Sequence, residues 1–323
     1  MRAAAMRNAA AIASRRQFSS ASYTVCVPIC AVLSAARGET RGSLTPCPSS
    51  NARSPASAIK SFKEKGYAVL PNFLTEAEVV PIERIYNRFM SGELAGPEKD
   101  FCDMSQSFAA IKGVHPDNWN IVNAMLPRKY HPPLQNNVYE QRAAAAAAQL
   151  FPGVTMAYDY DQFLNKRPQK KAAVFAWHQD MAYWPSRALT PDTRTVTFSL
   201  AVDATTVENG ALKFWPTSGV AGTLHPHKPV GASRDDTHAI AVHVDEANCV
   251  PPIEVVCVKR GDVTIHDEWV VHGSGGNFTQ GTRRTYVIAF RTEDTVRRER
   301  AAGFTHSHND AVNWDSFNPG TVG

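Results

Sequence analysis

A histidine and an aspartate, His178 and Asp180, stand two positions apart inside the aromatic stretch AWHQDMAYWP (176–185). Side chains at this spacing lie on the same face of an extended strand. A buried imidazole and carboxylate need a polar partner, which is solvent, a hydrogen-bond network or a metal ion. On its own, this short element favours a hydrogen-bonded network in the core over a metal site.

A second group of polar residues lies much later in the chain, in RGDVTIHDEWVVHGSGGNFTQGTRR (260–284), and it offers His266 and His272. One of these histidines, combined with His178 and Asp180, would complete a set of two imidazoles and one carboxylate. Such a set holds Fe(II) on one face and leaves coordination positions open for a cosubstrate and oxygen. The combination favours an iron site, whose third ligand must come from a strand distant in sequence.

An arginine in the same region fits the cosubstrate of such an iron site. An oxygenase that uses 2-oxoglutarate must hold the distal carboxylate of this molecule, ideally with a bidentate guanidinium. Arg283 follows His272 across a Gly-rich turn and begins the next strand, so an antiparallel return brings it back alongside. Ser274 is a plausible hydroxyl donor to the same carboxylate.

The elements that must position these residues are helical in the first third of the domain and extended afterwards. Thr75 and Glu78 form a capping box before a helix that runs to about Phe89, with Pro81 inside it. A second helix is predicted over 139–151, where the chain is rich in alanine. Beta-branched and aromatic segments, punctuated by Gly, Pro, Asn and Asp, predict strands at 154–165, 193–204, 210–216, 253–266 and 283–291.

This order of elements predicts an α+β protein that is mainly β, with flanking N-terminal helices. Helices followed by many short strands, without regular βαβ alternation, favour an antiparallel sandwich or barrel.

Four ordered motifs, WHQDMAYWP, NGALKFWPTSG, RGDV and HGSGGNFTQGTRR, resemble the phytanoyl-CoA dioxygenase family of Fe(II)/2-oxoglutarate oxygenases, which includes ectoine hydroxylase-like enzymes. The segment FKEKGYAVLPNFLTEAEV (62–79) is similar to the N-terminal part of that family, and the resemblance covers roughly residues 59–291. It implies a double-stranded β-helix (jelly-roll, cupin-like) core and a hydroxylase that uses Fe(II), 2-oxoglutarate and O2. The expected reaction hydroxylates an aliphatic C–H of a small metabolite or acyl-type substrate and releases succinate and CO2.

By motif position, the resemblance makes His178, Asp180 and His272 the iron ligands and leaves His266 a structural or supporting residue. It assigns Arg283, Ser274 and Asn165 to the binding of 2-oxoglutarate. The aromatic residues Trp177, Tyr183 and Trp184 are expected to line the substrate pocket or to pack in the core. Asp267 and Glu268 read as solvated turn acids, and His225 and His227 as loop residues. The family's usual PGSH is Pro216-Thr-Ser-Gly219 here, which indicates a different substrate pocket.

Two other classes stay open on the sequence alone. One is a cupin-like metal enzyme that does not use 2-oxoglutarate. The other is a non-catalytic barrel that binds a metal or a ligand. Arg283 argues against the first of these, and the substrate itself is not encoded in any readable motif.

The N-terminus predicts an organelle leader over 1–38, followed by a Ser/Pro-rich linker over 39–57 and the oxygenase domain over 58–323. The full chain has a formal net charge of +4. The leader holds five arginines and no acid, so the rest of the chain has a formal charge near −1. No basic stripe argues for nucleic acid. The leader composition favours mitochondrial import, with plastid or cytoplasmic location as alternatives. The apolar run 23–36 is too short to predict stable membrane insertion.

Overall fold

The computed structural model describes residues 55–231 and 239–311 of the chain. Its core is built from strands whose two faces differ in chemistry. In β6 (Thr195–Ala201), Val196, Phe198 and Leu200 face a large apolar core, whereas Thr197 and Ser199 on the other face line a cavity. This alternation follows from the two-residue period of a strand, and it separates a structural face from a polar one.

The larger sheet has seven strands in the order β1-β11-β6-β13-β4-β3-β2, and all of its pairings are antiparallel. A smaller antiparallel sheet has the order β10-β7-β12-β5, and β8 pairs with β9 alone. The strands span β1 Tyr67–Leu70, β2 Phe101–Asp103, β3 Ile121–Met125, β4 Met156–Lys166, β5 Phe175–His178, β7 Leu212–Trp215, β8 Lys228–Pro229, β9 Ile240–Ala241, β10 Glu254–Val256, β11 Val263–His266, β12 Val271–Ser274 and β13 Arg283–Thr292.

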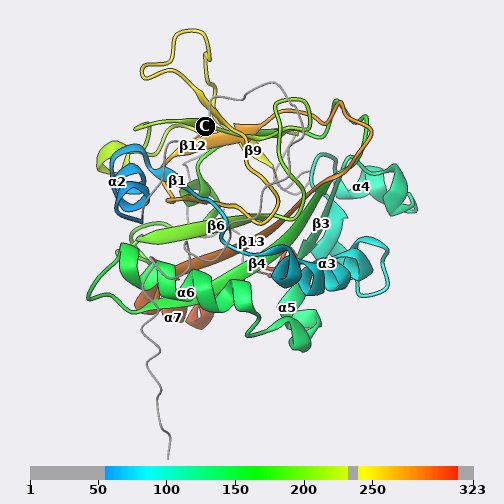
Figure 1. Cartoon of the computed structure of the whole chain (residues 1–323), viewed down its shortest axis with the longest axis horizontal. Coiled ribbons are helices and arrows are strands. Elements are labelled where there is room, and N and C mark those ends of the chain that lie inside the picture. The colour runs from blue at the N-terminus through cyan, green and yellow to red at the C-terminus, as the bar shows by residue number, and fades with distance from the viewer. Residues whose placement is uncertain (1–54, 232–238, 312–323) are drawn as a thin grey trace, which may run out of the picture.

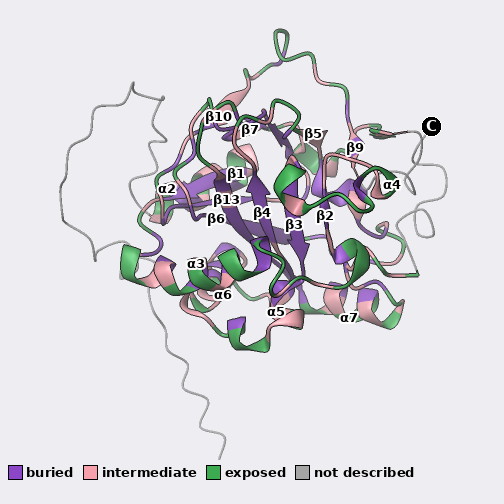
Figure 2. Cartoon of the chain, turned by 90° about the vertical axis from the view of Figure 1, so that its right-hand side faces the viewer, coloured by how far each residue is buried: buried purple, intermediate pink, exposed green. Residues whose placement is uncertain are grey.

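Helices cover the outer face of the larger sheet, and the smaller sheet lies over its inner face (Figure 1). The α-helices are α2 Pro55–Lys65, α3 Glu76–Met90, α4 Phe108–Ile111, α5 Pro127–Tyr130, α6 Val138–Leu150 and α7 Glu293–Ala301. Short 3-10 turns are η1 Glu98–Asp100, η2 Pro116–Asn118, η3 Pro132–Leu134, η4 Asp180–Tyr183 and η5 Val220–Gly222. Figure 2 shows the strands buried while the helices turn an exposed side outward.

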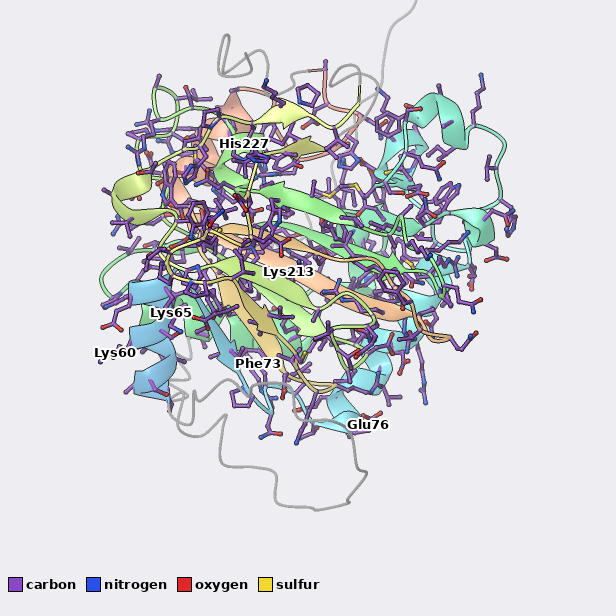
Figure 3. All side chains as sticks on the ribbon, turned by 90° about the horizontal axis from the view of Figure 1, so that it is seen from above. Lys60, Lys65, Phe73, Glu76, Lys213 and His227 are labelled. Atoms are coloured by element: carbon purple, nitrogen blue, oxygen red, sulfur yellow. The ribbon has the colours of Figure 1, made fainter. Side chains whose placement is uncertain are left out.

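The apolar core lies between the larger sheet and two of these helices. Tyr86 and Phe89 of α3 pack on Phe163 of β4, and Tyr139 of α6 contacts Tyr286 of β13. Burying apolar area at this interface stabilises the larger sheet, which carries half of the cavity wall. Figure 3 shows Lys60 and Lys65 on α2, where Lys60 is exposed and Lys65 pairs with Glu254 of β10.

The structure confirms the predicted α+β, mainly β organisation. The capping box is present, with Thr75 at the N-cap, and α3 continues through Pro81 to Met90. The run predicted as one strand over 253–266 is instead two, β10 and β11, with a turn at Gly261 (φ 84°) between them. The predicted leader and most of the linker lie outside the described residues, and α2 begins at Pro55, inside the end of the segment predicted as linker.

In the two described ranges, no helix is both long and apolar enough to cross a membrane.

Replacing Phe163 by alanine tests the interface between helices and sheet. The Phe163 side chain is fully buried, so Phe163→Ala leaves a cavity and should lower the free energy of unfolding by about 3–5 kcal/mol. Phe278→Ala removes an exposed phenyl group and should change it by less than about 0.5 kcal/mol. Urea unfolding followed by circular dichroism measures both values, and equal losses for the two variants would contradict this account of the core.

Candidate active site

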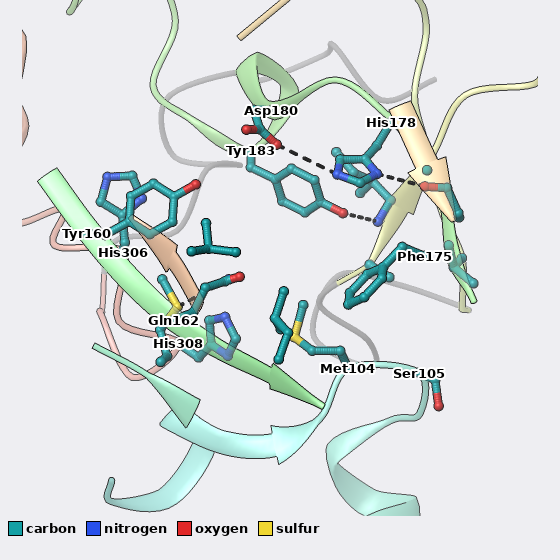
Figure 4. Close-up of a pocket in the computed structure, with 18 of the residues that line it drawn as sticks. Met104, Ser105, Tyr160, Gln162, Phe175, His178, Asp180, Tyr183, His306 and His308 are labelled. Atoms are coloured by element: carbon teal, nitrogen blue, oxygen red, sulfur yellow. Dashed lines mark hydrogen bonds and ion pairs between the residues drawn. The ribbon is translucent and has the colours of Figure 1, made fainter. Parts of the chain in front are cut away.

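A cavity of about 720 Å³ lies between the two sheets. The larger sheet contributes Thr197 and Ser199 of β6 and Gln162 of β4 to its wall, and the smaller sheet contributes His178 of β5 and His272 of β12. Figure 4 shows this space, with His178, Asp180 and Tyr183 on one side and Tyr160, Gln162 and His306 across from them. The polar faces of both sheets therefore meet in one internal site.

The three predicted metal ligands converge in this cavity. His178 ends β5 and lies directly opposite His272 in the antiparallel pair with β12. Asp180 follows at the start of η4, so the carboxylate turns in from the exit of the strand. Its Oδ1 lies 3.7 Å from Nε2 of His178 and 3.6 Å from Nε2 of His272. The ligand atoms of the three residues all lie within 4.8 Å of one another.

Hydrogen bonds to the backbone fix which nitrogen of each imidazole faces the centre. Nδ1 of His178 lies 2.7 Å from the Ala176 carbonyl oxygen, and Nδ1 of His272 lies 3.0 Å from that of Val270. A carbonyl oxygen only accepts, so both Nδ1 atoms carry the proton. The Nε2 lone pairs are left to point at a common centre, as in histidines that bind metals.

The electrostatics of the trio suit a cation. Burial would raise the pKa of Asp180, but His272, His266 and His178 around it hold this pKa below its usual value. Burial lowers the pKa of His272 well below the ordinary range. The site thus presents an ionised carboxylate and neutral imidazoles, which are the protonation states that metal ligation requires.

His266 is a partner of the carboxylate rather than a member of the trio. Its Nε2 lies 3.2 Å from Oδ2 of Asp180, and the Thr197 hydroxyl donates to the same oxygen over 3.2 Å. The two contacts occupy the oxygen that turns away from His178 and His272. His266 therefore orients Asp180, which agrees with the supporting position predicted for it.

Arg283 lies buried in the cavity wall at the start of β13. Its side chain is 3% exposed, and its Nε finds no hydrogen-bond partner among the described residues. Burial lowers the pKa of Arg283 to about 10, so the guanidinium remains charged at neutral pH. A buried guanidinium without a protein counter-ion is costly unless a ligand supplies one.

A lysine that sequence reasoning missed lies beside this arginine. Lys166 of β4 is the cross-strand neighbour of Arg283, and its Nζ donates to the Ser274 hydroxyl over 2.6 Å and to the Gly275 carbonyl. Burial lowers the pKa of Lys166 well below its ordinary value. Because the Ser274 oxygen accepts from Lys166, the Ser274 proton is left to donate elsewhere. The only sequence signal was the alternation of β4, which places Lys166 on the face of Gln162.

Two of the remaining predicted residues lie away from the cavity. Asn165 pairs with Arg284 on the face of β4 opposite to Lys166, and it is absent from the described cavity lining. The Trp177 indole donates to Glu246 and lies under Lys213 on the outer side of β5. Strand alternation explains both corrections, because each residue neighbours one that faces the cavity. Tyr183 and Trp184 do line the cavity.

Gln179, between the two candidate ligands of the His-x-Asp element, is a second residue that sequence reasoning missed. Its amide donates to the carbonyls of Thr223 and Trp269, and its backbone N–H donates to Nε2 of His227 over 3.0 Å. His227, interpreted from sequence as a loop residue, is 3% exposed. These bonds anchor the strand exit from which His178 and Asp180 project.

The prediction that Asp267 and Glu268 are solvated turn acids is wrong. Glu268 is 3% exposed and accepts from the Thr195 backbone N–H over 3.1 Å. Burial, with the charge of Asp267 as a further cause, raises the pKa of Glu268 to about 8. Asp267 accepts from the backbone of Trp269 and Val270 and shapes the turn before β12.

With this geometry in place, comparison with known proteins decides the family. The sequence profile described as Phytanoyl-CoA dioxygenase (PhyH) matches residues 62–285. The chain belongs to the phytanoyl-CoA dioxygenase family. It is 23% identical to the peroxisomal phytanoyl-CoA dioxygenase of Mus musculus, over 73% of this chain and 68% of that protein. It is 22% identical to the ectoine dioxygenase of Streptomyces avermitilis, over 76% and 81%.

Solved structures carry the same fold. The chain superimposes on EvdO2 from Micromonospora carbonacea, crystallised with 2-oxoglutarate, with a TM-score of 0.58 and 23% identity over 73% of this chain and 90% of that one. Family membership confirms the predicted jelly-roll core and the activity class, a dioxygenase that depends on Fe(II), 2-oxoglutarate and O2. The convergent Nε2 atoms, the ionised Asp180 and the Nε of Arg283, which has no partner among the described residues, fit these groups.

The protonation of Glu268 should appear in the pH dependence of stability. An unfolded glutamate ionises near its ordinary pKa, whereas Glu268 in the folded protein keeps its proton up to about pH 8. The stabilisation is thus complete below the ordinary pKa and is lost as pH rises toward 8. Relative to Glu268→Gln, the wild type should lose on the order of 1 kcal/mol of unfolding free energy per pH unit across this window.

Urea unfolding at several pH values between 5 and 8 measures this difference. Glu64→Gln, on the exposed side of α2, serves as the control and should parallel the wild type. Parallel curves for the wild type and Glu268→Gln would show that Glu268 is ionised in the folded protein.

Proposed function

We propose that His178, Asp180 and His272 hold Fe(II) and that the protein hydroxylates an aliphatic C–H of a small molecule bound in the cavity. The observation that carries this proposal is the convergence of three ligand atoms within 4.8 Å, with both Nδ1 protons held by backbone carbonyls. Fe(II), O2 and 2-oxoglutarate together supply the oxidant for such a reaction and release succinate and CO2. The residues of the chain supply binding, orientation and exclusion of water.

Arg283 holds the distal carboxylate of 2-oxoglutarate in this proposal. The guanidinium offers a planar fork to a carboxylate, and the ligand removes the cost of its unpaired burial. Ser274 donates its free proton to the same group, while Lys166 fixes the serine from behind. Asn165 has no part in this arrangement, because it lies on the far face of β4.

The size and lining of the cavity support a small-molecule substrate. Its volume of about 720 Å³ falls in the range of metabolite pockets, and apolar residues such as Val287, Leu164 and Phe175 share the wall with a few polar ones. Tyr183 and Trp184 belong to this wall, whereas Trp177 does not. Mitochondrial import of the protein stays a prediction from the leader composition. The absence of a nucleic-acid partner also stays a prediction, based on the lack of a basic stripe in the sequence.

Succinate release tests the proposal directly. Purified protein with Fe(II), 2-oxoglutarate and air should form succinate, and a metabolite panel should contain a compound that gains one oxygen by mass spectrometry. His178→Ala removes one of three ligands and should lower succinate formation by at least about 100-fold, together with Fe(II) affinity. His243→Ala changes an exposed histidine outside the cavity lining and should behave as wild type. Full activity of His178→Ala would overturn the assignment of the iron site.

Arg283 separates an oxygenase that uses 2-oxoglutarate from a cupin-like enzyme that does not. Arg283→Ala should raise the KM for 2-oxoglutarate by about 10- to 100-fold, because two charge-assisted hydrogen bonds are lost, and Fe(II) affinity should stay unchanged. Arg283→Lys keeps the positive charge but loses the planar fork of the guanidinium, so its KM for 2-oxoglutarate should lie between those of the wild type and Arg283→Ala. Arg297→Ala, on the exposed side of α7, is the control. An unchanged KM in Arg283→Ala would favour the alternative enzyme class.

A further inference from the structure

The last described segment, residues 304–311, closes one side of the cavity. Its residues in the wall are Phe304, His306, Ser307, His308, Asp310 and Ala311. The family profile ends at residue 285, so this wall lies beyond the part of the chain that defines the family. The cavity therefore has one end built from the family motifs and another built from the segment that follows α7.

Hydrogen bonds fasten this segment to the turn η1. The buried carboxylate of Asp100 accepts from the Ser307 hydroxyl and from the His308 backbone N–H, each over 2.7 Å. The amide of Asn309 donates to the Pro97 carbonyl over 3.1 Å. The segment is thus a fixed wall, and the side chain of Lys99 lines the cavity beside it.

His306 joins this wall to a buried cluster of charges. Its Nε2 lies 2.8 Å from Oδ2 of Asp159 and 3.5 Å from Oε2 of Glu299. Arg291 contacts both carboxylates, at 3.5 Å and 2.5 Å, and Arg300 lies 2.5 Å from Asp159. Two carboxylates therefore face two guanidinium groups and one imidazole.

The charge balance of the cluster decides what it can hold. Asp159, Glu299 and His306 are spaced as metal ligands would be, but Arg291 and Arg300 already neutralise the two carboxylates. A metal cation would add positive charge to a cluster that has no uncompensated negative charge. Burial would lower the pKa of His306, but Asp159 and Glu299 raise it above its ordinary value. The imidazolium then leaves the cluster with one net positive charge.

The imidazole of His306 is held where it reaches the cavity. It stacks on Tyr160 with ring centroids 4.4 Å apart, and Figure 4 shows the two rings across the cavity from His178. The backbone of His306 has a φ of 66°, a left-handed conformation that residues other than glycine seldom adopt. Strain of this kind persists where the surroundings over-determine a side chain, often at binding sites.

The acids nearest to this end of the cavity are already engaged. Asp310 accepts from the backbone N–H and the hydroxyl of Thr305, over 2.6 Å and 2.8 Å. Asp100 accepts from Tyr130 as well as from the segment. The positive groups, by contrast, line the space itself: His306 inside and Lys99 toward the exposed surface.

We propose that this end of the cavity binds an anionic group of the substrate, with the chemistry of a carboxylate or a phosphonate, and that His306 is the inner cation that recognises it, with Lys99 as the outer one. The proposal rests on the proposed function for the identity of the site, and it deepens that function by stating the substrate class. Arg283 is reserved for 2-oxoglutarate, so His306 provides a second and separate anion position.

A pair of matched ligands tests the charge preference without turnover. Octanoate and octanamide have nearly the same shape, and only the first is an anion. Calorimetric titration of the anaerobic protein, loaded with Fe(II) and saturated with 2-oxoglutarate, should show octanoate binding at least about tenfold more tightly than octanamide. In His306→Gln, octanoate affinity should fall about tenfold while octanamide affinity stays within about threefold.

Control variants keep the test decisive. Lys99→Gln changes an exposed side chain, and it should reduce the octanoate preference by a smaller factor than His306→Gln does. His243→Gln should leave it unchanged. The affinity of each variant for 2-oxoglutarate shows that the fold is intact. Equal binding of both ligands by the wild type would overturn the proposal, and so would an equal loss for both ligands in His306→Gln, which marks a purely structural histidine.

The outcome is separable from that of the proposed function. Protein that prefers octanoate but forms no succinate from 2-oxoglutarate retains the anion position and refutes the oxygenase assignment. Protein that forms succinate and binds both ligands equally retains the oxygenase assignment and refutes the anion position.

Discussion

His272 lies directly opposite His178 in the antiparallel pair of β12 and β5, and this register determines where the other polar groups of the cavity fall. A shift of one residue in such a pair would turn one imidazole out of the cavity and expose an apolar neighbour in its place. The register is held by β7 on the other side of β12, where Phe214 lies opposite His272 and stacks on its ring. Gln179 then ties the exit of β5 to the loop that contains Thr223. The proposed iron site is therefore a consequence of strand pairing, because the third ligand of the short His-x-Asp element comes from a strand far away in sequence.

The same two-residue period divides the larger sheet into a face for stability and a face for chemistry. Residues such as Phe163 and Phe198 bury apolar area against α3 and α6. This burial offsets the cost of placing Arg283 and Lys166 on the opposite face, where neither forms an ion pair with a residue that the structure describes. The positive charge of Arg283 in this wall opposes the charged form of Lys166 beside it, and burial lowers the pKa of Lys166 as well. A dianionic ligand such as 2-oxoglutarate relieves that repulsion, so the wall is organised for the complex rather than for the free state.

Local patterns in the sequence predicted α3, α6, β4, β6, β7 and β13, because capping residues, alternation and turn residues act over a few positions. They did not separate β10 from β11, and they did not select β2, β3 or β5. They also identified the trio, since the spacing of His178 and Asp180 is local and His272 follows from the resemblance. The orientation of Trp177 and Asn165 was beyond such reasoning, because a residue next to a cavity-facing position points to the opposite face and the phase of a strand is set by its partners. The burial of Glu268 could not be predicted for a related reason. Its local sequence is typical of an exposed turn, but β6 covers it in the fold.

The cluster around His306 illustrates the largest gap between sequence and site. Its members come from β4, β13, α7 and the following segment. Glu299 and Arg300 are adjacent in sequence, but Asp159 lies far before the other members, so no local pattern predicts that they meet. Asp159 in particular reads as a polar position in an alternating strand, and only the fold reveals that it meets two arginines and a histidine. In these proposals, the metal ligands and the 2-oxoglutarate anchor lie on the family motifs. The anionic end of the substrate is held by His306, which follows the motifs, and by Lys99 of η1, which precedes the iron ligands. A substrate whose anionic end is held at His306 presents to the iron whichever carbon its length allows. The position of hydroxylation is then decided by the spacing between the two ends of the cavity rather than by the reactivity of the C–H bonds.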